Sequence, residues 1–147
     1  MPTPVNRREV LGAAAAALAV AASGAPAAAA NDYEAQIVAF TGGVAPGEDG
    51  AVRLDLPELA ENGNTVPLSV KVNPPAGRRV TEILIVAPEN PRSRVIRFRF
   101  SDASVPEAAT RIRLAATQEV IAVAKLDDGA CLSASRQIKV TIGGCGG

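Results

Sequence analysis

Short stretches in which apolar and polar residues alternate, separated by prolines and glycines, occupy most of this chain. The stretch TVPLSVKV (65–72) places four apolar side chains on one face, with Ser69 and Lys71 on the other. RVIRFRF (94–100) and QIKVTI (137–142) alternate in the same way. A period of two residues is typical of a β-strand that buries one of its faces. The chain is therefore expected to fold mainly as β-strands.

Counting every such stretch gives seven or eight short strands. The others are AQIVAF (35–40), VRLDL (52–56), ILIVA (83–87), TRIRLAA (110–116) and EVIAVAKL (119–126). DDG (127–129) predicts a hairpin turn, because Asp-Gly favours the backbone conformation of tight turns. PELAENG (57–63) is compatible with one helical turn or with a solvated loop. No segment is long enough for helices that connect parallel strands, so residues 31–142 are expected to form an all-β, immunoglobulin-like sandwich.

The first thirty residues are expected to be an export signal and not part of the fold. Arg7 and Arg8 precede an apolar run from Val10 to Ala22, which is followed by small residues suited to signal cleavage. The run is shorter than the roughly 20 residues needed to span a membrane. We therefore expect a twin-arginine signal peptide over 1–30, cleavage near Asn31, a periplasmic location and no membrane anchor.

Composition and charge exclude several classes of function for the mature chain. Removing the signal leaves 13 basic and 14 acidic residues, a net charge of −1, which gives no electrostatic footprint for nucleic acid. The chain has no histidine and two cysteines, so a structural zinc site is not expected. The acidic residues Asp55, Glu58 and Glu61 are interpreted as a polar rim. No catalytic residue, metal or cofactor is predicted.

The chain ends in TIGGCGG, which places a cysteine among glycines at the terminus. Cys145 is flanked by Gly143, Gly144, Gly146 and Gly147. Glycine loses more conformational entropy on ordering than any other residue, so residues 143–147 are expected to form a mobile arm. Three residues beyond Ile142, the thiol would reach about 10 Å from its anchor. Such an arm suits a group that is held covalently on Cys145 and presented to active sites of other proteins.

Two alternatives remain open on these residues. In an oxidising compartment, Cys131 and Cys145 could form a disulfide in a non-catalytic binding or adhesion module of immunoglobulin type. Alternatively, the terminal carboxylate of Gly147, rather than the thiol, could accept sulfur after adenylation, although that reaction requires cytosolic ATP. A count of free thiols separates the disulfide-bonded module from a thiol carrier.

The chain resembles the SoxY family, the sulfur-carrier subunits of the bacterial thiosulfate-oxidising system. The resemblance rests on the twin-arginine signal, LDLPELAENGNTVPLSVKV (54–72), TRIRLAATQEVIAVAKLDDG (110–129) and the terminal GGCGG. It implies a carrier rather than an enzyme, with Cys145 as the attachment site for thiosulfate-derived sulfur. The implied partners are a SoxZ-like β subunit, the haem protein SoxAX, the hydrolase SoxB and a sulfane dehydrogenase. Cys131 lies outside the family motif and takes no role from it.

Overall fold

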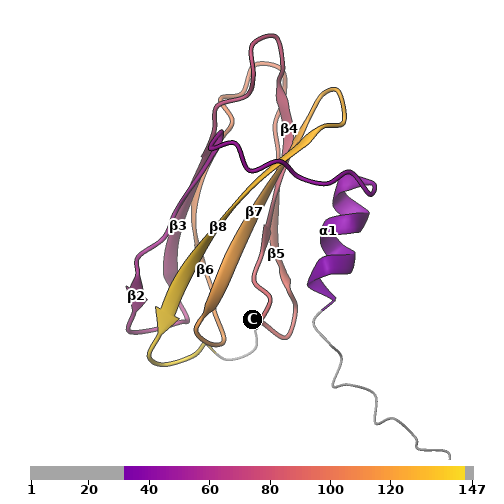
Figure 1. Ribbon diagram of the computed structural model, residues 1–147. Coiled ribbons are helices and arrows are strands. Elements are labelled where there is room, and N and C mark those ends of the chain that lie inside the picture. The colour runs from indigo at the N-terminus through magenta and orange to yellow at the C-terminus, as the bar shows by residue number, and fades with distance from the viewer. Residues whose placement is uncertain (1–31, 145–147) are drawn as a thin grey trace, which may run out of the picture.

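The protein, described here for residues 32–144 in a computed structural model, consists of two β-sheets packed face to face with one helix outside them (Figure 1). The elements in chain order are α1 (Tyr33–Thr41), β1 (Val52–Asp55), β2 (Leu59–Ala60), β3 (Val66–Val72), β4 (Val80–Val86), β5 (Arg94–Arg99), β6 (Glu107–Ile112), β7 (Gln118–Leu126) and β8 (Cys131–Val140). One sheet has the order β1-β3-β6 and the other β2-β8-β7-β4-β5. The predicted all-β, immunoglobulin-like sandwich is confirmed.

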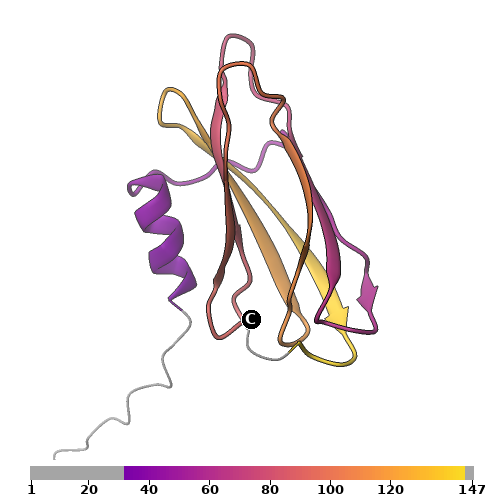
Figure 2. The same ribbon diagram turned by 180° about the vertical axis from the view of Figure 1, so that it is seen from behind.

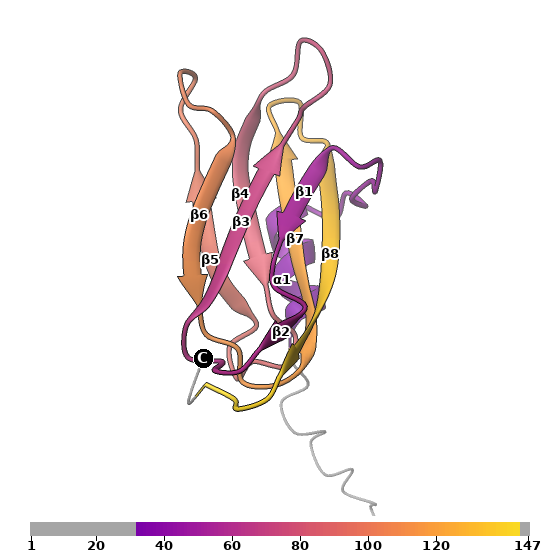
Figure 3. The same ribbon diagram turned by 90° about the vertical axis from the view of Figure 1, so that its left-hand side faces the viewer.

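Alternation along the strands produces the core between the two sheets. All four apolar residues of β3, at positions 66, 68, 70 and 72, are buried, and the intervening residues face outward. Figure 3 looks onto the three-stranded sheet, with β3 and β6 in front of the strands of the five-stranded sheet. The side chains that are fully buried and largest by volume include Ile83, Ile85, Leu114 and Ile138. A Val, Ile and Leu core of this kind forms without tryptophan.

The predicted strand at AQIVAF is wrong, because these residues belong to helix α1. The helix lies against the outer face of the five-stranded sheet (Figure 2), where Phe40 packs with Leu84, Val86 and Val123. Strands β4 and β7 are apolar on both faces, so they need a cover on the outside as well as a core inside. Residues 35–40 supply that cover, and a short apolar run does not by itself distinguish a helix from a strand.

Two smaller differences between the sequence prediction and the structure concern segments near the end of β8. PELAENG forms neither a helical turn nor a simple loop, since Leu59 and Ala60 make the short strand β2, parallel to β8. Ile142, placed in the last strand by its alternation, lies beyond Val140 and is 65% exposed. The strand therefore ends earlier than the apolar pattern does.

Strands β4, β6 and β8 run in the same direction, so the segments that follow them gather at one end of the sandwich (Figure 3). Those segments are 87–93, 113–117 and 141–144, and the β2–β3 connection at 61–65 lies beside them. This end of the molecule is where the chain leaves the sandwich toward its C-terminus.

Candidate functional site

Backbone hydrogen bonds fix the last described residues of the chain to two neighbouring loops. The Gly144 N–H donates to the carbonyl of Leu114 at 2.8 Å, and the Gly63 N–H donates to the carbonyl of Ile142 at 2.7 Å. The Leu114 N–H in turn donates to the carbonyl of Gly63 at 2.8 Å. Three segments that are distant in sequence are thus joined at the base of the C-terminal tail.

Glycine is required at this junction because the backbones approach too closely for a side chain. A Cβ atom on Gly144 would lie 2.9 Å from the carbonyl oxygen of Gly63. A Cβ on Gly63 or on Gly143 would overlap the carbonyl oxygen of Leu114 or of Ala115, respectively. We refer to Gly63, Gly143 and Gly144 as the glycine clasp. None of the three has a positive φ, so their shared property is the absence of a side chain.

This packing changes the boundary of the C-terminal arm. The glycine-rich sequence predicted a mobile arm from Gly143 onward, whereas the structure packs Gly143 and Gly144 against neighbouring backbone, and Gly144 is buried. These two glycines therefore serve close packing at the base of the tail. Cys145, Gly146 and Gly147 lie outside the described residues. Gly63 was not singled out from the sequence, because a glycine in a loop carries no sign of which backbone it will meet.

A buried asparagine supports the loop that receives the tail. Asn90 is 2% exposed, and its Nδ2 donates to the carbonyl of Arg113 at 2.8 Å. Its Oδ1 accepts hydrogen bonds from the backbone N–H of Ala115 at 2.8 Å and from Nε2 of Gln118 at 3.1 Å. A buried amide with its donor and acceptor both satisfied rigidifies the chain around it. Asn90 thus holds residues 113–115 in place for the glycine clasp.

The second cysteine lies at the other end of the sandwich, under the helix. Cys131 begins β8, is 4% exposed and packs with Phe40 of α1. Its thiol donates a weak hydrogen bond to the carbonyl of Gly129 at 3.7 Å. Burial raises the pKa of the Cys131 thiol and outweighs the opposing effect of the Lys125 charge on that pKa. Such a thiol behaves as a small packed side chain and not as a nucleophile.

Cys131 and Gly144, the residue before Cys145, lie at opposite ends of the sandwich, which disfavours a disulfide between Cys131 and Cys145 within one chain. Strand β8 runs for ten residues from Cys131 to Val140, which at 3.3 Å per residue separates its ends by about 30 Å. Cys145 follows Gly144, which is fixed beyond the far end of that strand. A disulfide needs Cα atoms within about 7 Å of each other. The described residues therefore do not support the binding module with a Cys131–Cys145 disulfide.

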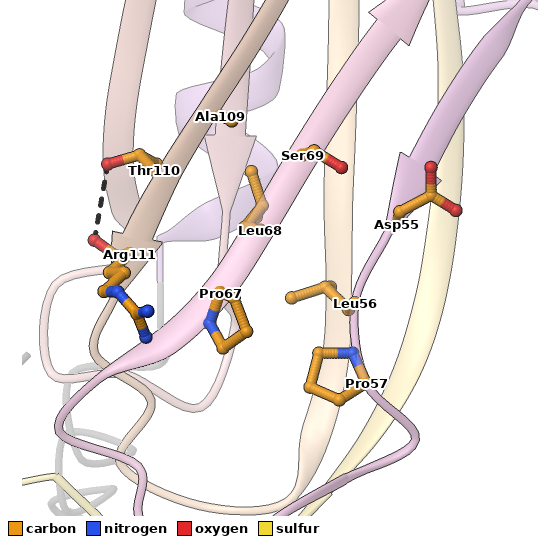
Figure 4. A pocket seen from close by; sticks show the side chains of 9 residues that line it. All are labelled: Asp55, Leu56, Pro57, Pro67, Leu68, Ser69, Ala109, Thr110 and Arg111. Atoms are coloured by element: carbon orange, nitrogen blue, oxygen red, sulfur yellow. Dashed lines mark hydrogen bonds between the residues drawn. The ribbon is translucent and has the colours of Figure 1, made fainter.

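The hollow on the outer face of the three-stranded sheet does not gather reactive groups. It has a volume of about 640 Å³, and Figure 4 shows Asp55 and Arg111 on different strands at opposite sides of it. The Asp55 carboxylate instead pairs with Arg53 at 3.6 Å, and Glu58 and Glu61 are exposed. Within residues 32–144 there is no group of three acidic, cysteine or histidine residues that could hold a metal ion. No helix in that part of the chain is long and apolar enough to cross a membrane.

Comparisons with known proteins identify the family of this chain. The profile of the family described as "Sulfur oxidation protein SoxY" matches residues 37–145. The solved structure of the sulfur carrier protein SoxY from Chlorobium limicola f thiosulfatophilum has 33% sequence identity and a TM-score of 0.64. That match covers 74% of this chain and 96% of the Chlorobium chain. A search of curated proteins found no match.

More distant structures share the fold alone. A superoxide reductase (neelaredoxin) from Ignicoccus hospitalis has 18% identity and a TM-score of 0.54, over 61% of this chain and 80% of that one. A putative superoxide reductase from Thermotoga maritima has 16% identity and a TM-score of 0.52, over 60% and 84% of the two chains. The sandwich is thus common to several classes of protein, whereas the family profile extends along the chain to the terminal cysteine. This chain belongs to the SoxY family of sulfur oxidation proteins.

Proposed function

We propose that this protein is a sulfur carrier that holds thiosulfate-derived intermediates covalently on Cys145. The observation that carries the proposal is the glycine clasp, which fixes the backbone one residue before this cysteine at one end of the sandwich. Cys131 is buried at the opposite end, which leaves Cys145 as the thiol suited to exchange. The family match ends at Cys145 itself.

The chemistry of loading requires an external oxidant. The Cys145 thiol loses its proton, and its sulfur forms an S–S bond with the sulfane sulfur of thiosulfate. Two electrons leave, and we assign their acceptor to a haem-containing partner of the SoxAX type. The product is a cysteine S-thiosulfonate. Water then attacks its terminal sulfonate in a SoxB-type hydrolase, which releases sulfate and a proton and leaves a persulfide on Cys145. A sulfane dehydrogenase acts on that persulfide in turn.

The protein supplies position and access, and its partners supply catalysis. No basic residue lies within the last seven positions to stabilise a thiolate, so activation of Cys145 falls to the partner enzymes. We further propose that the chain pairs with a SoxZ-like β subunit and works in the periplasm after twin-arginine export. Arg7 and Arg8 and the apolar run that follows them support this location.

Thiosulfate oxidation reconstituted with the partner enzymes tests the proposal. We expect Cys145→Ser to abolish the reaction completely while the melting temperature stays unchanged, since the substituted residue follows the packed base of the tail. Cys131→Ser is the matched control, and it should retain the reaction even though it loses stability. Retained activity in Cys145→Ser would refute the proposal, and so would loss of activity in a folded Cys131→Ser protein.

A further inference from the structure

An open flank of the sandwich carries a cleft between the edge strands of the two sheets. Strand β5 is the last strand of the five-stranded sheet and β6 the last of the three-stranded sheet, and Figure 3 shows them adjacent on one side. The cleft has a volume of about 340 Å³. Its lining residues are Asn90, Arg92, Arg94, Val95, Ile96, Arg111, Ile112 and Arg113.

All the charged residues that line this cleft are positive. Four of its eight lining residues are arginines, and none is a carboxylate. Within residues 32–144, none of these four arginines takes part in an ion pair. The paired basic residues in that region lie elsewhere and are Arg53, Lys71, Arg78, Arg79 and Arg97. The cleft therefore concentrates positive charge in a protein whose mature chain is nearly neutral.

The cleft combines exposed arginines with a less exposed lining. Its four arginines are exposed, whereas its other lining residues are buried or half-buried, with Ile112 at 4% exposure. The register of β5 against β4 shifts at Val95, so that Arg94 pairs with Val86 and Ile96 with Ile85. A bulge of this kind changes the direction of a side chain at a sheet edge. Guanidinium groups bind oxyanions through paired N–H donors.

The same cleft adjoins the base of the tail. Arg113 lines the cleft, and the next residue, Leu114, accepts the hydrogen bond from the Gly144 N–H. Asn90 lines the cleft too, and it bonds to the backbone of Arg113 and of Ala115. Cys145 follows Gly144 at a Cα spacing of about 3.8 Å. A group held on Cys145 thus starts beside the wall of this cleft.

We propose that the arginine cleft, lined by Arg92, Arg94, Arg111 and Arg113 between β5 and β6, binds a tetrahedral sulfur oxyanion. Its source is either free thiosulfate or sulfate, or the sulfonate end of cargo held on Cys145. The second source rests on the proposed carrier function, and the first does not. In the second case the cleft is a docking site for the loaded tail, where the anionic cargo rests between visits to partner enzymes. A neutral thiol would not be held there.

Charged residues on edge strands also keep sheets from pairing with other chains. That role needs charge but no bound anion. It predicts that anions have no localised effect on the cleft, so the two roles are separated by a binding measurement.

The free-anion arm uses the full mature chain carrying Cys145→Ser, so that it does not depend on any cargo. Sodium sulfate and sodium thiosulfate are titrated against sodium chloride at equal ionic strength, and backbone amide shifts are followed by NMR. We expect saturable shifts at Ile96, Ile112 and Arg113. Arg92→Gln combined with Arg113→Gln should weaken binding roughly tenfold or more, since each charge-assisted bond contributes strongly. The matched control is Arg99→Gln with Arg136→Gln, two exposed arginines outside the cleft.

The cargo arm uses the chain with Cys145 intact, loaded with tetrathionate. The thiolate displaces one thiosulfate and keeps the S-thiosulfonate, so no other oxidant is needed. Docked cargo should shift the same amides without added anion, and the Arg92→Gln/Arg113→Gln variant should lose those shifts. Shifts in this arm identify cargo as a source, and shifts in the first arm alone identify free anion.

The absence of localised shifts in both arms would overturn the proposal. Equal amide shifts in the Arg92→Gln/Arg113→Gln variant and in the Arg99→Gln/Arg136→Gln control would also overturn it. If neither experiment produces amide shifts while the Arg92→Gln/Arg113→Gln variant loses turnover by partner enzymes, the arginines bind an acidic protein surface. That result also overturns the proposal. Failure of tetrathionate to load Cys145 would count against the carrier function and leave the free-anion arm intact as a test of the cleft.

Discussion

Glycine at three positions lets separate backbone segments meet at the base of the tail. The glycine clasp joins the β2–β3 loop and the β6–β7 loop to the end of the chain, and each member leaves no room for a methyl group. The clasp fixes the last described residue, Gly144, at one end of the sandwich. Its role in function is therefore positional, through the backbone it fixes next to Cys145.

Alanine substitutions in the glycine clasp test whether these positions require glycine. Gly143→Ala or Gly63→Ala should lower the free energy of unfolding by about 1–3 kcal/mol, because the new methyl group overlaps a backbone carbonyl. Gly47→Ala is the control, since its Cβ would meet Leu132 at an ordinary 3.7 Å, and a change below about 0.5 kcal/mol is expected. Urea denaturation measures both. Equal, small effects at all three positions would show that the packing does not need glycine.

The buried Cys131 thiol should make the stability of the fold depend on pH. The pKa of Cys131 is raised above its ordinary value of 9.0, so the folded state favours the protonated thiol more than the unfolded state does. Its contribution to stability is present below pH 9.0 and is lost as pH rises through the higher pKa of the folded state. The stability of the parent chain relative to Cys131→Ala should therefore fall as pH rises above 9.0. A difference that does not change with pH would contradict the buried, protonated thiol.

Helix α1 closes the outer face of the five-stranded sheet over Cys131. Phe40 provides its main contact and is 6% exposed, and both Lys125 and Arg97 lie over its ring at 6.0 and 5.3 Å, respectively.

The strands were predictable from sequence because half-buried strands leave a period of two, as in β3. The helix was not, because its short apolar run becomes a helix only through the sheet face it covers. The clasp and Asn90 were not predictable either, since their partners are distant backbone groups.

Removing the main contact of α1 should therefore expose the buried cysteine. Phe40→Ala is expected to cost about 3–5 kcal/mol and to speed alkylation of Cys131 by iodoacetamide. Val38→Ala, in the same helix but 57% exposed, should change neither quantity appreciably. Peptide mapping of the alkylated chain gives the rate for each cysteine. An unchanged rate at Cys131 in Phe40→Ala would mean that the helix does not protect it.

The two ends of the sandwich differ in what they hold. One end of the sandwich holds a sealed thiol under a helix, and the other holds the clasp, the arginine cleft and the start of the tail. This arrangement suits the proposed carrier role, in which a stable body is presented to several enzymes while chemistry occurs on Cys145. The proposed twin-arginine route transports folded proteins, so we expect a partner without its own signal to be exported with this chain.

Export is tested by changing the arginine pair. Arg7→Lys with Arg8→Lys should retain both this protein and its SoxZ-like partner in the cytoplasm, because the paired arginines are what the export route recognises. Immunoblots of periplasmic and cytoplasmic fractions measure both proteins, with Arg53→Lys as a control within the mature domain. Normal amounts of the partner in the periplasm of the double variant would contradict joint export.

The mass of the intact protein tests the central claim most directly. The chain is purified without reductant from cells oxidising thiosulfate, and its peptides are fragmented to locate any adduct. We predict a population that carries a sulfur-containing adduct, such as one added S2O3 unit or one added sulfur atom, on Cys145 and unmodified Cys131. Dithiothreitol should remove the adduct. A protein with Cys145 free of sulfur under these conditions, or with its sulfur on Cys131, would contradict the account.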